Sequence, residues 1–99
     1  LGVEPSETLC KLSSKKKIKT ICDFLGLSLS QKIKKNYRLP DLIIANNVLA
    51  HVPNITEFVE SLSNLMSNKT LLTIEFPHLL NLIKYKQFDT IYHEHYSYI

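Results

Sequence analysis

One five-residue stretch constrains the fold of this chain more than any other part of the sequence. Residues 41–45 read Asp-Leu-Ile-Ile-Ala and directly follow Pro40. Leu42, Ile43 and Ile44 would point alternately to the two faces of a strand, so both faces need an apolar cover. Strands of this kind occur at the centre of parallel sheets that carry helices on both sides. The stretch therefore predicts an α/β fold.

The remaining sequence alternates between short strands and short helices, as an α/β fold requires. We expect strands at residues 1–3, 18–24, 41–45 and 71–76. We expect helices after Ser6 and at residues 28–37, 54–66 and 79–83, with an irregular or extended segment at residues 88–99. These assignments follow from hydrophobic periodicity and from the positions of proline and capping residues.

Three local signals define the predicted helix ends. Ser6 is placed to cap the first helix, and Asn54 with Glu57 forms a capping-box pattern for the third. Asn68 is expected to adopt the left-handed turn conformation that glycine usually takes. The third helix has the clearest apolar stripe, which consists of Ile55, Phe58, Val59, Leu62, Leu65 and Met66.

Glycine content and charge exclude two classes of ligand site within these residues. Gly2 and Gly26 are the only glycines, so the chain holds no glycine-rich phosphate loop. Residues 1–40 carry a net charge of +6 and residues 41–99 a net charge of −3. Eleven of the twelve basic residues are lysines, and no aromatic residue interrupts the lysines of residues 15–19. We therefore expect no nucleic-acid partner.

Cysteine use and hydropathy indicate a cytoplasmic protein. Cys10 and Cys22 have neither a C-x-x-C spacing nor the spacing of metal ligands, so we expect reduced, partly buried thiols. No apolar run approaches the ~18 residues of a membrane span, and no signal peptide opens the chain. We expect no membrane association, and nothing indicates an oligomeric state.

Polar residues follow each predicted strand. They are Glu4, Asp23, the pair Asn46 and Asn47, and Glu75 with His78. Because ligands of open parallel sheets bind beyond the carboxyl ends of the strands, these residues predict a binding cleft. Glu4 has two interpretations at this point: an acceptor for ribose hydroxyls, or an acid favoured by the dipole of the following helix.

The most unusual stretch is residues 88–98, which read Phe-Asp-Thr-Ile-Tyr-His-Glu-His-Tyr-Ser-Tyr. Imidazole and phenol groups at this density are typical of general acid–base chemistry, and His51 follows the third strand toward the same edge. Two other interpretations remain. In the first, His93 and His95 point the same way in an extended chain and Glu94 or His51 completes a metal site, although we expect none. In the second, the rings serve packing alone.

Three of these segments, in this order, resemble the S-adenosylmethionine-dependent sugar C-methyltransferases, which methylate nucleotide-linked keto-deoxysugars. Residues 2–6 resemble the second-strand motif of that family, and residues 41–52 resemble its fourth-strand motif. Residues 88–98 resemble its active-site signature. The resemblance implies part of a Rossmann-like, doubly wound sheet and places the ribose-binding acid of the family on Glu4.

The resemblance also implies roles for the other polar residues. Asp23 and Phe24 would contact the adenine side of S-adenosylmethionine, while Asn46 and Asn47 would lie near its methionine end. The catalytic groups would be His51, Tyr92, Glu94 and His95. His95 would act as the base that removes the proton beside the keto group of the sugar. His51, Tyr92 and Glu94 would orient the sugar or stabilise the enolate.

Finally, the resemblance implies that the chain is an internal part of a longer enzyme. Residues 1–87 would be part of the cofactor-binding domain, and residues 88–99 an active-site segment leading into a further domain. The first strand, the glycine-rich loop and a possible zinc region would precede Leu1. Without that first strand the other strands would form two unconnected pairs. The alternatives are a methyltransferase for another keto substrate and a non-catalytic α/β binding fragment.

Overall fold

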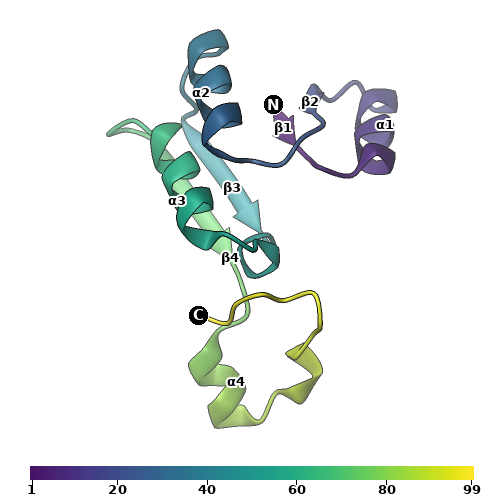
Figure 1. Cartoon of the computed structure of the whole chain (residues 1–99), viewed down its shortest axis with the longest axis vertical. Coiled ribbons are helices and arrows are strands. Elements are labelled where there is room, and N and C mark those ends of the chain that lie inside the picture. Colours follow the sequence, from purple (N-terminus) through teal and green to yellow (C-terminus); the bar gives the residue numbers. More distant parts are fainter. The chain divides into compact units, whose positions relative to one another are not determined.

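The computed structural model describes all 99 residues, in which helices and short strands alternate (Figure 1). The elements in chain order are β1 (Gly2–Val3), α1 (Glu7–Lys15), β2 (Thr20–Ile21), α2 (Leu27–Asn36), β3 (Leu42–Asn46), the 3-10 helix η1 (Leu49–His51), α3 (Ile55–Asn64), β4 (Leu71–Glu75), α4 (Leu79–Tyr85) and the 3-10 helix η2 (Phe88–Thr90). This arrangement confirms the α/β class. None of the helices combines the length and apolar character needed to cross a bilayer.

The chain divides into two compact units, and each contains one parallel pair of strands. Unit 1 comprises residues 1–38 and 57–65, and unit 2 comprises residues 39–56 and 66–99. In unit 1, β1 pairs with β2; in unit 2, β3 pairs with β4 over five residues on each strand. The strands thus form two separate two-stranded sheets, as the family resemblance implied.

In unit 1, Glu4 connects both strands to α1. Its backbone N–H donates to the carbonyl of Ile21 (3.0 Å), and its own carbonyl accepts from the thiol of Cys10 on α1 (3.1 Å). Its carboxylate accepts from the backbone N–H of Ser6 (2.8 Å). The prediction that the Ser6 side chain caps α1 is wrong, since it makes no capping hydrogen bond. The strand β2 is also shorter than predicted.

The contact between α2 and α3 explains why residue 26 is a glycine. The carboxylate of Glu57 accepts from the backbone N–H of Leu27 in the first turn of α2 (3.3 Å). A Cβ atom at Gly26 would lie 2.9 Å from the same carboxylate oxygen, so a larger residue would displace it. Ser30 on α2 is fully buried and accepts from the amide of Asn64 (3.0 Å).

The predicted apolar stripe on α3 is only partly correct. Phe58 and Leu62 are buried, but Val59 is 49% exposed. The polar residue Ser61 is fully buried on the inner side of the helix. The hydroxyl of Ser61 donates to the carbonyl of Glu57 one helical turn earlier (2.7 Å). Because that bond satisfies the hydroxyl within the helix, a polar side chain is tolerated where the sequence pattern predicts an apolar one.

In unit 2, a side chain rather than a left-handed residue closes the turn before β4. The hydroxyl of Thr70 donates to the carbonyl of Pro40 (2.7 Å) and accepts from the N–H of Ser67 (2.9 Å). Asn68 does not have a positive φ, so that prediction is wrong. The Thr70 hydroxyl makes the glycine-like conformation unnecessary because it joins the turn to the residue preceding Asp41.

The β3–β4 pair leaves one face exposed, contrary to the prediction of two covered faces. Leu42 and Ile44 are 49% and 64% exposed, and Leu71 on β4, which pairs with Leu42, is 69% exposed. Ala45, which points to the opposite face, is buried. The apolar side chains on the face that carries Ile44 therefore remain in contact with solvent.

We therefore predict that the 99-residue chain alone does not fold cooperatively. Apolar surface on β3, β4 and α4 is not removed from water, and two short sheets have unpaired edges. Calorimetry of the isolated chain should show no sharp thermal transition, and a hydrophobic dye should bind at ambient temperature. A single cooperative transition would contradict this prediction.

Candidate active site

Four aromatic rings from two separate parts of unit 2 lie against one another. His51 ends η1, and Tyr92, His95 and Tyr98 belong to the C-terminal segment; we call these four residues the ring cluster. The His95 ring lies at its centre, with centroid distances of 4.7 Å to His51, 5.4 Å to Tyr92 and 5.4 Å to Tyr98. His51 and Tyr92 are 6.3 Å apart. All four contacts are edge-to-face, the arrangement that aromatic rings favour.

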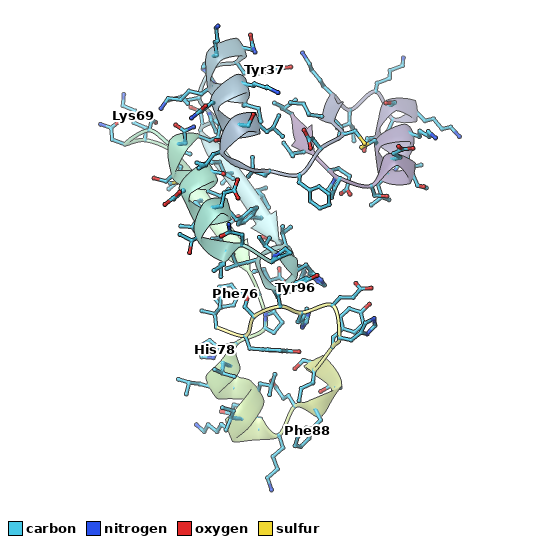
Figure 2. The ribbon with its side chains drawn as sticks, in the orientation of Figure 1. Tyr37, Lys69, Phe76, His78, Phe88 and Tyr96 are labelled. Atoms are coloured by element: carbon cyan, nitrogen blue, oxygen red, sulfur yellow. The ribbon has the colours of Figure 1, made fainter.

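Backbone hydrogen bonds hold the two parts of the ring cluster together. The carbonyl of Ala50, beside His51, accepts from the N–H groups of Tyr96 (2.7 Å) and Ser97 (3.4 Å). Figure 2 shows Tyr96 where the C-terminal segment passes η1. Ala50 is only 1% exposed, so the anchoring carbonyl belongs to a buried residue. The N–H of His95 donates to the carbonyl of Tyr92 (3.0 Å), which closes a turn between those two rings.

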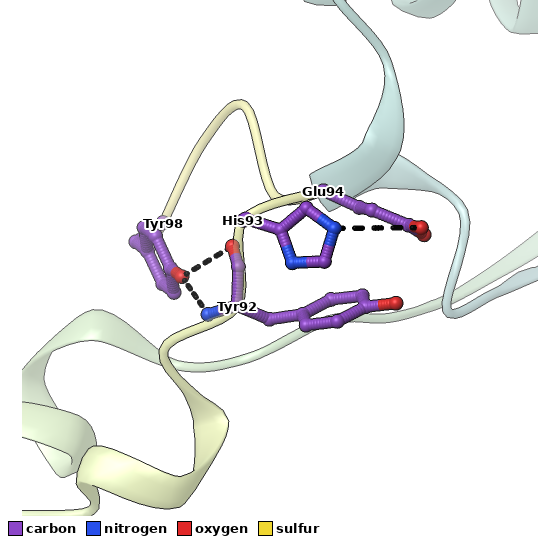
Figure 3. Close-up of polar contacts among 4 residues, drawn as sticks. All are labelled: Tyr92, His93, Glu94 and Tyr98. Carbon is purple, nitrogen blue, oxygen red and sulfur yellow. Dashed lines mark hydrogen bonds and ion pairs between the residues drawn. The ribbon is translucent and has the colours of Figure 1, made fainter.

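Glu94 is the acidic group of this region. Hydrogen bonding to Glu94, followed by partial burial and by the negative charge of Glu94, raises the pKa of the Tyr92 phenol above its usual value of 10.0. The ring nitrogen of the exposed His93 also lies 3.9 Å from the carboxylate (Figure 3). Tyr92 is therefore a protonated hydrogen-bond donor at neutral pH.

The ring cluster contains polar atoms without a partner. Nδ1 of His95 and the hydroxyl of Ser97 are both buried and make no hydrogen bond. Buried polar atoms are nearly always paired, so unpaired ones are candidates for groups that meet a ligand. Nε2 of His95 is not among these buried, unpaired atoms.

The carboxyl ends of β3 and β4 place Asn46 and Asn47 beside Glu75. Asn47 follows β3 with a φ of 53°, a left-handed conformation that asparagine tolerates better than most residues. Its N–H donates to the carbonyl of Glu75 (2.8 Å), and its side-chain amide donates to the carboxylate of Glu75 (3.1 Å). Asn46 ends β3 opposite Glu75 and is exposed.

In unit 1, Asp23 and Phe24 follow β2 and line a cavity of about 480 Å³ together with Cys10 and Cys22. The carboxylate of Asp23 accepts from the N–H of Phe24 (2.8 Å), and the Phe24 ring is 75% exposed. Burial and the neighbouring thiol of Cys22, with smaller contributions from nearby carboxylates, raise the pKa of Cys10 to about 11. Cys22 itself is exposed rather than partly buried.

The structure thus brings together the four residues predicted to be catalytic. His51, Tyr92, Glu94 and His95 all lie in unit 2, where the three rings are in contact and Glu94 raises the pKa of Tyr92. The residues predicted to bind the cofactor are divided. Glu4, Asp23 and Phe24 belong to unit 1, whereas Asn46 and Asn47 belong to unit 2.

Sequence reasoning assigned no role to Tyr98, although Tyr98 is part of the ring cluster. Its hydroxyl lies 2.9 Å from the backbone nitrogen of Tyr92. No periodicity signals this contact, because it depends on the way the irregular segment folds back on itself. No three or more His, Cys, Asp or Glu side chains are grouped so that they could hold a metal ion.

Replacing Glu94 with glutamine should lower the pKa of Tyr92. The substitution removes the negative charge and the carboxylate acceptor, both of which disfavour the phenolate. Titration of the tyrosine ring carbons by NMR, with Tyr92→Phe to assign the signal, should show ionisation at lower pH in Glu94→Gln. The signals of Tyr37 and Tyr85, which lie outside the cluster, should not move. An unchanged or higher pKa for Tyr92 would show that Glu94 does not raise the pKa of this phenol.

Comparison with known proteins helps to interpret the ring cluster and the two strand pairs. No protein-family model matches the chain. Over 98 residues the chain is 33% identical to the C-methyltransferase NovU of Streptomyces niveus. The match takes in 99% of this chain but only 23% of that relative, so the chain spans about a quarter of its length. The similarity supports a methyltransferase family, and the two parallel strand pairs fit part of a Rossmann-like fold.

Proposed function

We propose that this chain is part of an S-adenosylmethionine-dependent C-methyltransferase that acts on a nucleotide-linked keto-deoxysugar. The observation that carries the proposal is the convergence of His51, Tyr92, Glu94 and His95 in unit 2, in a chain similar to a C-methyltransferase. Imidazole and phenol groups held in contact are suited to removing a proton beside a carbonyl group. The sugar substrate rests on the resemblance of residues 88–98 to the active-site signature of that family.

The residues expected to hold S-adenosylmethionine fit its adenosine part. The exposed Phe24 ring offers a surface for a flat base, and Asp23 beside it offers hydrogen-bond acceptors. The cavity that they line, about 480 Å³, lies within the range of about 300–1,000 Å³ typical of small-molecule sites. Glu4 would accept from the ribose hydroxyls with the oxygen not bonded to Ser6. When bound, the cofactor would supply an electrophilic methyl group.

Within the ring cluster, His95 would remove the proton next to the keto group through Nε2. The electrons of the broken C–H bond would pass to the keto oxygen, which becomes an enolate. The Tyr92 phenol, kept protonated by its raised pKa, and the His51 ring would donate hydrogen bonds to that oxygen. Glu94 would keep the Tyr92 hydroxyl oriented until the substrate binds. Asn46 and Asn47 would contact the methionine end of the bound cofactor, which restricts the position of its methyl group.

Replacing His95 with alanine in the full-length protein should lower kcat for methyl transfer by about 10²–10⁴-fold, because the base is lost. Transfer of the labelled methyl group from S-adenosylmethionine to the sugar would measure it. His93→Ala is the matched control, since His93 is also an imidazole of the same segment and its ring contacts Tyr92 (4.7 Å), but its side chain is 81% exposed and no ring contact joins it to His95 or His51. His93→Ala should keep near-normal turnover.

The alternatives make different predictions for the same two variants. If the enzyme acts on another keto substrate, His95→Ala still abolishes turnover, but the nucleotide-linked sugar is not methylated by the wild type. If the chain is a non-catalytic binding fragment, no keto compound is methylated by any variant. Near-normal turnover in His95→Ala would show that His95 is not the base.

Replacing Glu4 with glutamine should weaken S-adenosylmethionine binding by about tenfold or more, because hydrogen bonds to charged groups contribute about 1.5–3 kcal/mol. Glutamine retains an acceptor for the N–H of Ser6 but presents an amide donor to the ribose. Calorimetric titration of the full-length protein would measure the change, with Glu60→Gln on the exposed side of α3 as control. Equal affinities in the two variants would contradict the ribose role.

A further inference from the structure

We propose that Tyr98 is a positioning residue for the proton-transfer step, which holds Tyr92 and His95 in place through its hydroxyl and its ring. This inference rests on the proposed function and extends it to a residue with no assigned role. The Tyr98 hydroxyl accepts from the backbone N–H of Tyr92 (2.9 Å) and donates to the carbonyl of Tyr92 (3.4 Å) (Figure 3). The Tyr98 ring stands edge-on to the His95 ring at 5.4 Å.

The two hydrogen bonds distinguish the role of Tyr98 from that of Tyr92. The Tyr98 hydroxyl lies 2.9 Å from the backbone nitrogen and 3.4 Å from the carbonyl oxygen of Tyr92, so it faces the Tyr92 backbone. Tyr92, in contrast, is 44% exposed, and its hydroxyl interacts with the side chain of Glu94, which a substrate oxygen can replace. Tyr98 therefore acts on the reaction through Tyr92 and His95 and not by touching the reacting atoms.

Backbone bonds on both sides of Tyr98 fix its position independently of the hydroxyl. On one side Tyr96 and Ser97 donate to the carbonyl of Ala50, and on the other side the carbonyl of Ile99 accepts from the N–H of Leu79 (2.8 Å). Tyr98→Phe therefore removes the two hydroxyl contacts while the ring and the course of the chain remain. The turn bond from His95 to the Tyr92 carbonyl also remains, so the orientation of Tyr92 loosens without loss of the segment.

The ring of Tyr98 adds a second restraint. It lies on His95, the central member of the ring cluster, whose Nδ1 has no hydrogen-bond partner. A histidine without a hydrogen bond to Nδ1 lacks the usual means of fixing ring orientation. Packing against Tyr98, His51 and Tyr92 supplies that orientation instead.

The test compares Tyr98→Phe with Tyr96→Phe in the full-length protein. Tyr96 lies in the same segment, its side chain is 68% exposed, and only its backbone takes part in the anchor to Ala50. In Tyr98→Phe we expect kcat per bound S-adenosylmethionine to fall by about tenfold to a hundredfold, with KM for the sugar unchanged. Normalising to bound cofactor removes any loss through unfolding, and Tyr96→Phe should keep wild-type kcat.

A readout independent of activity separates this inference from the proposed function. Amide hydrogen exchange at Tyr92 should be faster in Tyr98→Phe than in wild type and unchanged in Tyr96→Phe, because only the first variant removes the acceptor of that N–H. Equal exchange at Tyr92 in both variants would overturn the inference, and so would unchanged kcat in an active Tyr98→Phe enzyme. Absence of methyl transfer in the wild-type enzyme would instead refute the proposed function. Amide exchange at Tyr92 would then still show whether the Tyr98 hydroxyl holds the Tyr92 backbone.

Discussion

The hydrogen bond from Tyr96 to the carbonyl of Ala50 is the interaction on which the candidate active site depends. At 2.7 Å it joins the histidine-rich C-terminal segment to the 3-10 helix that ends in His51. Neither part has much regular structure of its own, so this bond is what holds the two imidazole rings near each other. With it, the rings of His51 and His95 come within 4.7 Å, and Tyr92 and Tyr98 close around them.

The fold class followed from local patterns, but several details of packing did not. Alternation of strands and helices, and the division of the strands into two pairs, were predicted from the sequence and its family resemblance. The exposure of Ile44 and Val59 was not, because apolar periodicity indicates which side chains would suit an interior and not whether a partner covers them. The turn at Asn68 was also mispredicted, since a distant bond from Thr70 to Pro40 replaced the local turn signal.

For the polar residues at the strand ends, too, the sequence pointed to the local contacts and not to the long-range one. Glu4 and Asp23 were identified from their positions after the strands, and both carboxylates bond to nearby backbone N–H groups. Each of these contacts spans one or two residues, which is why position alone could point to them. The link between Asn47 and Glu75 depends on two strands far apart in the sequence. Sequence reasoning placed both residues at one edge of the sheet but could not show that they are hydrogen-bonded.

By itself, the sequence determined the chemistry available to this protein: imidazole, phenol and carboxylate groups concentrated in residues 88–98, and an α/β framework to carry them. The tertiary structure alone decided which of those groups meet. It placed His95 at the centre of the ring cluster, brought Glu94 near enough to raise the pKa of Tyr92 and brought the hydroxyl of Tyr98 to the Tyr92 backbone. The reason is physical, because an irregular segment has no repeating backbone geometry and its long-range hydrogen bonds set the direction of every side chain.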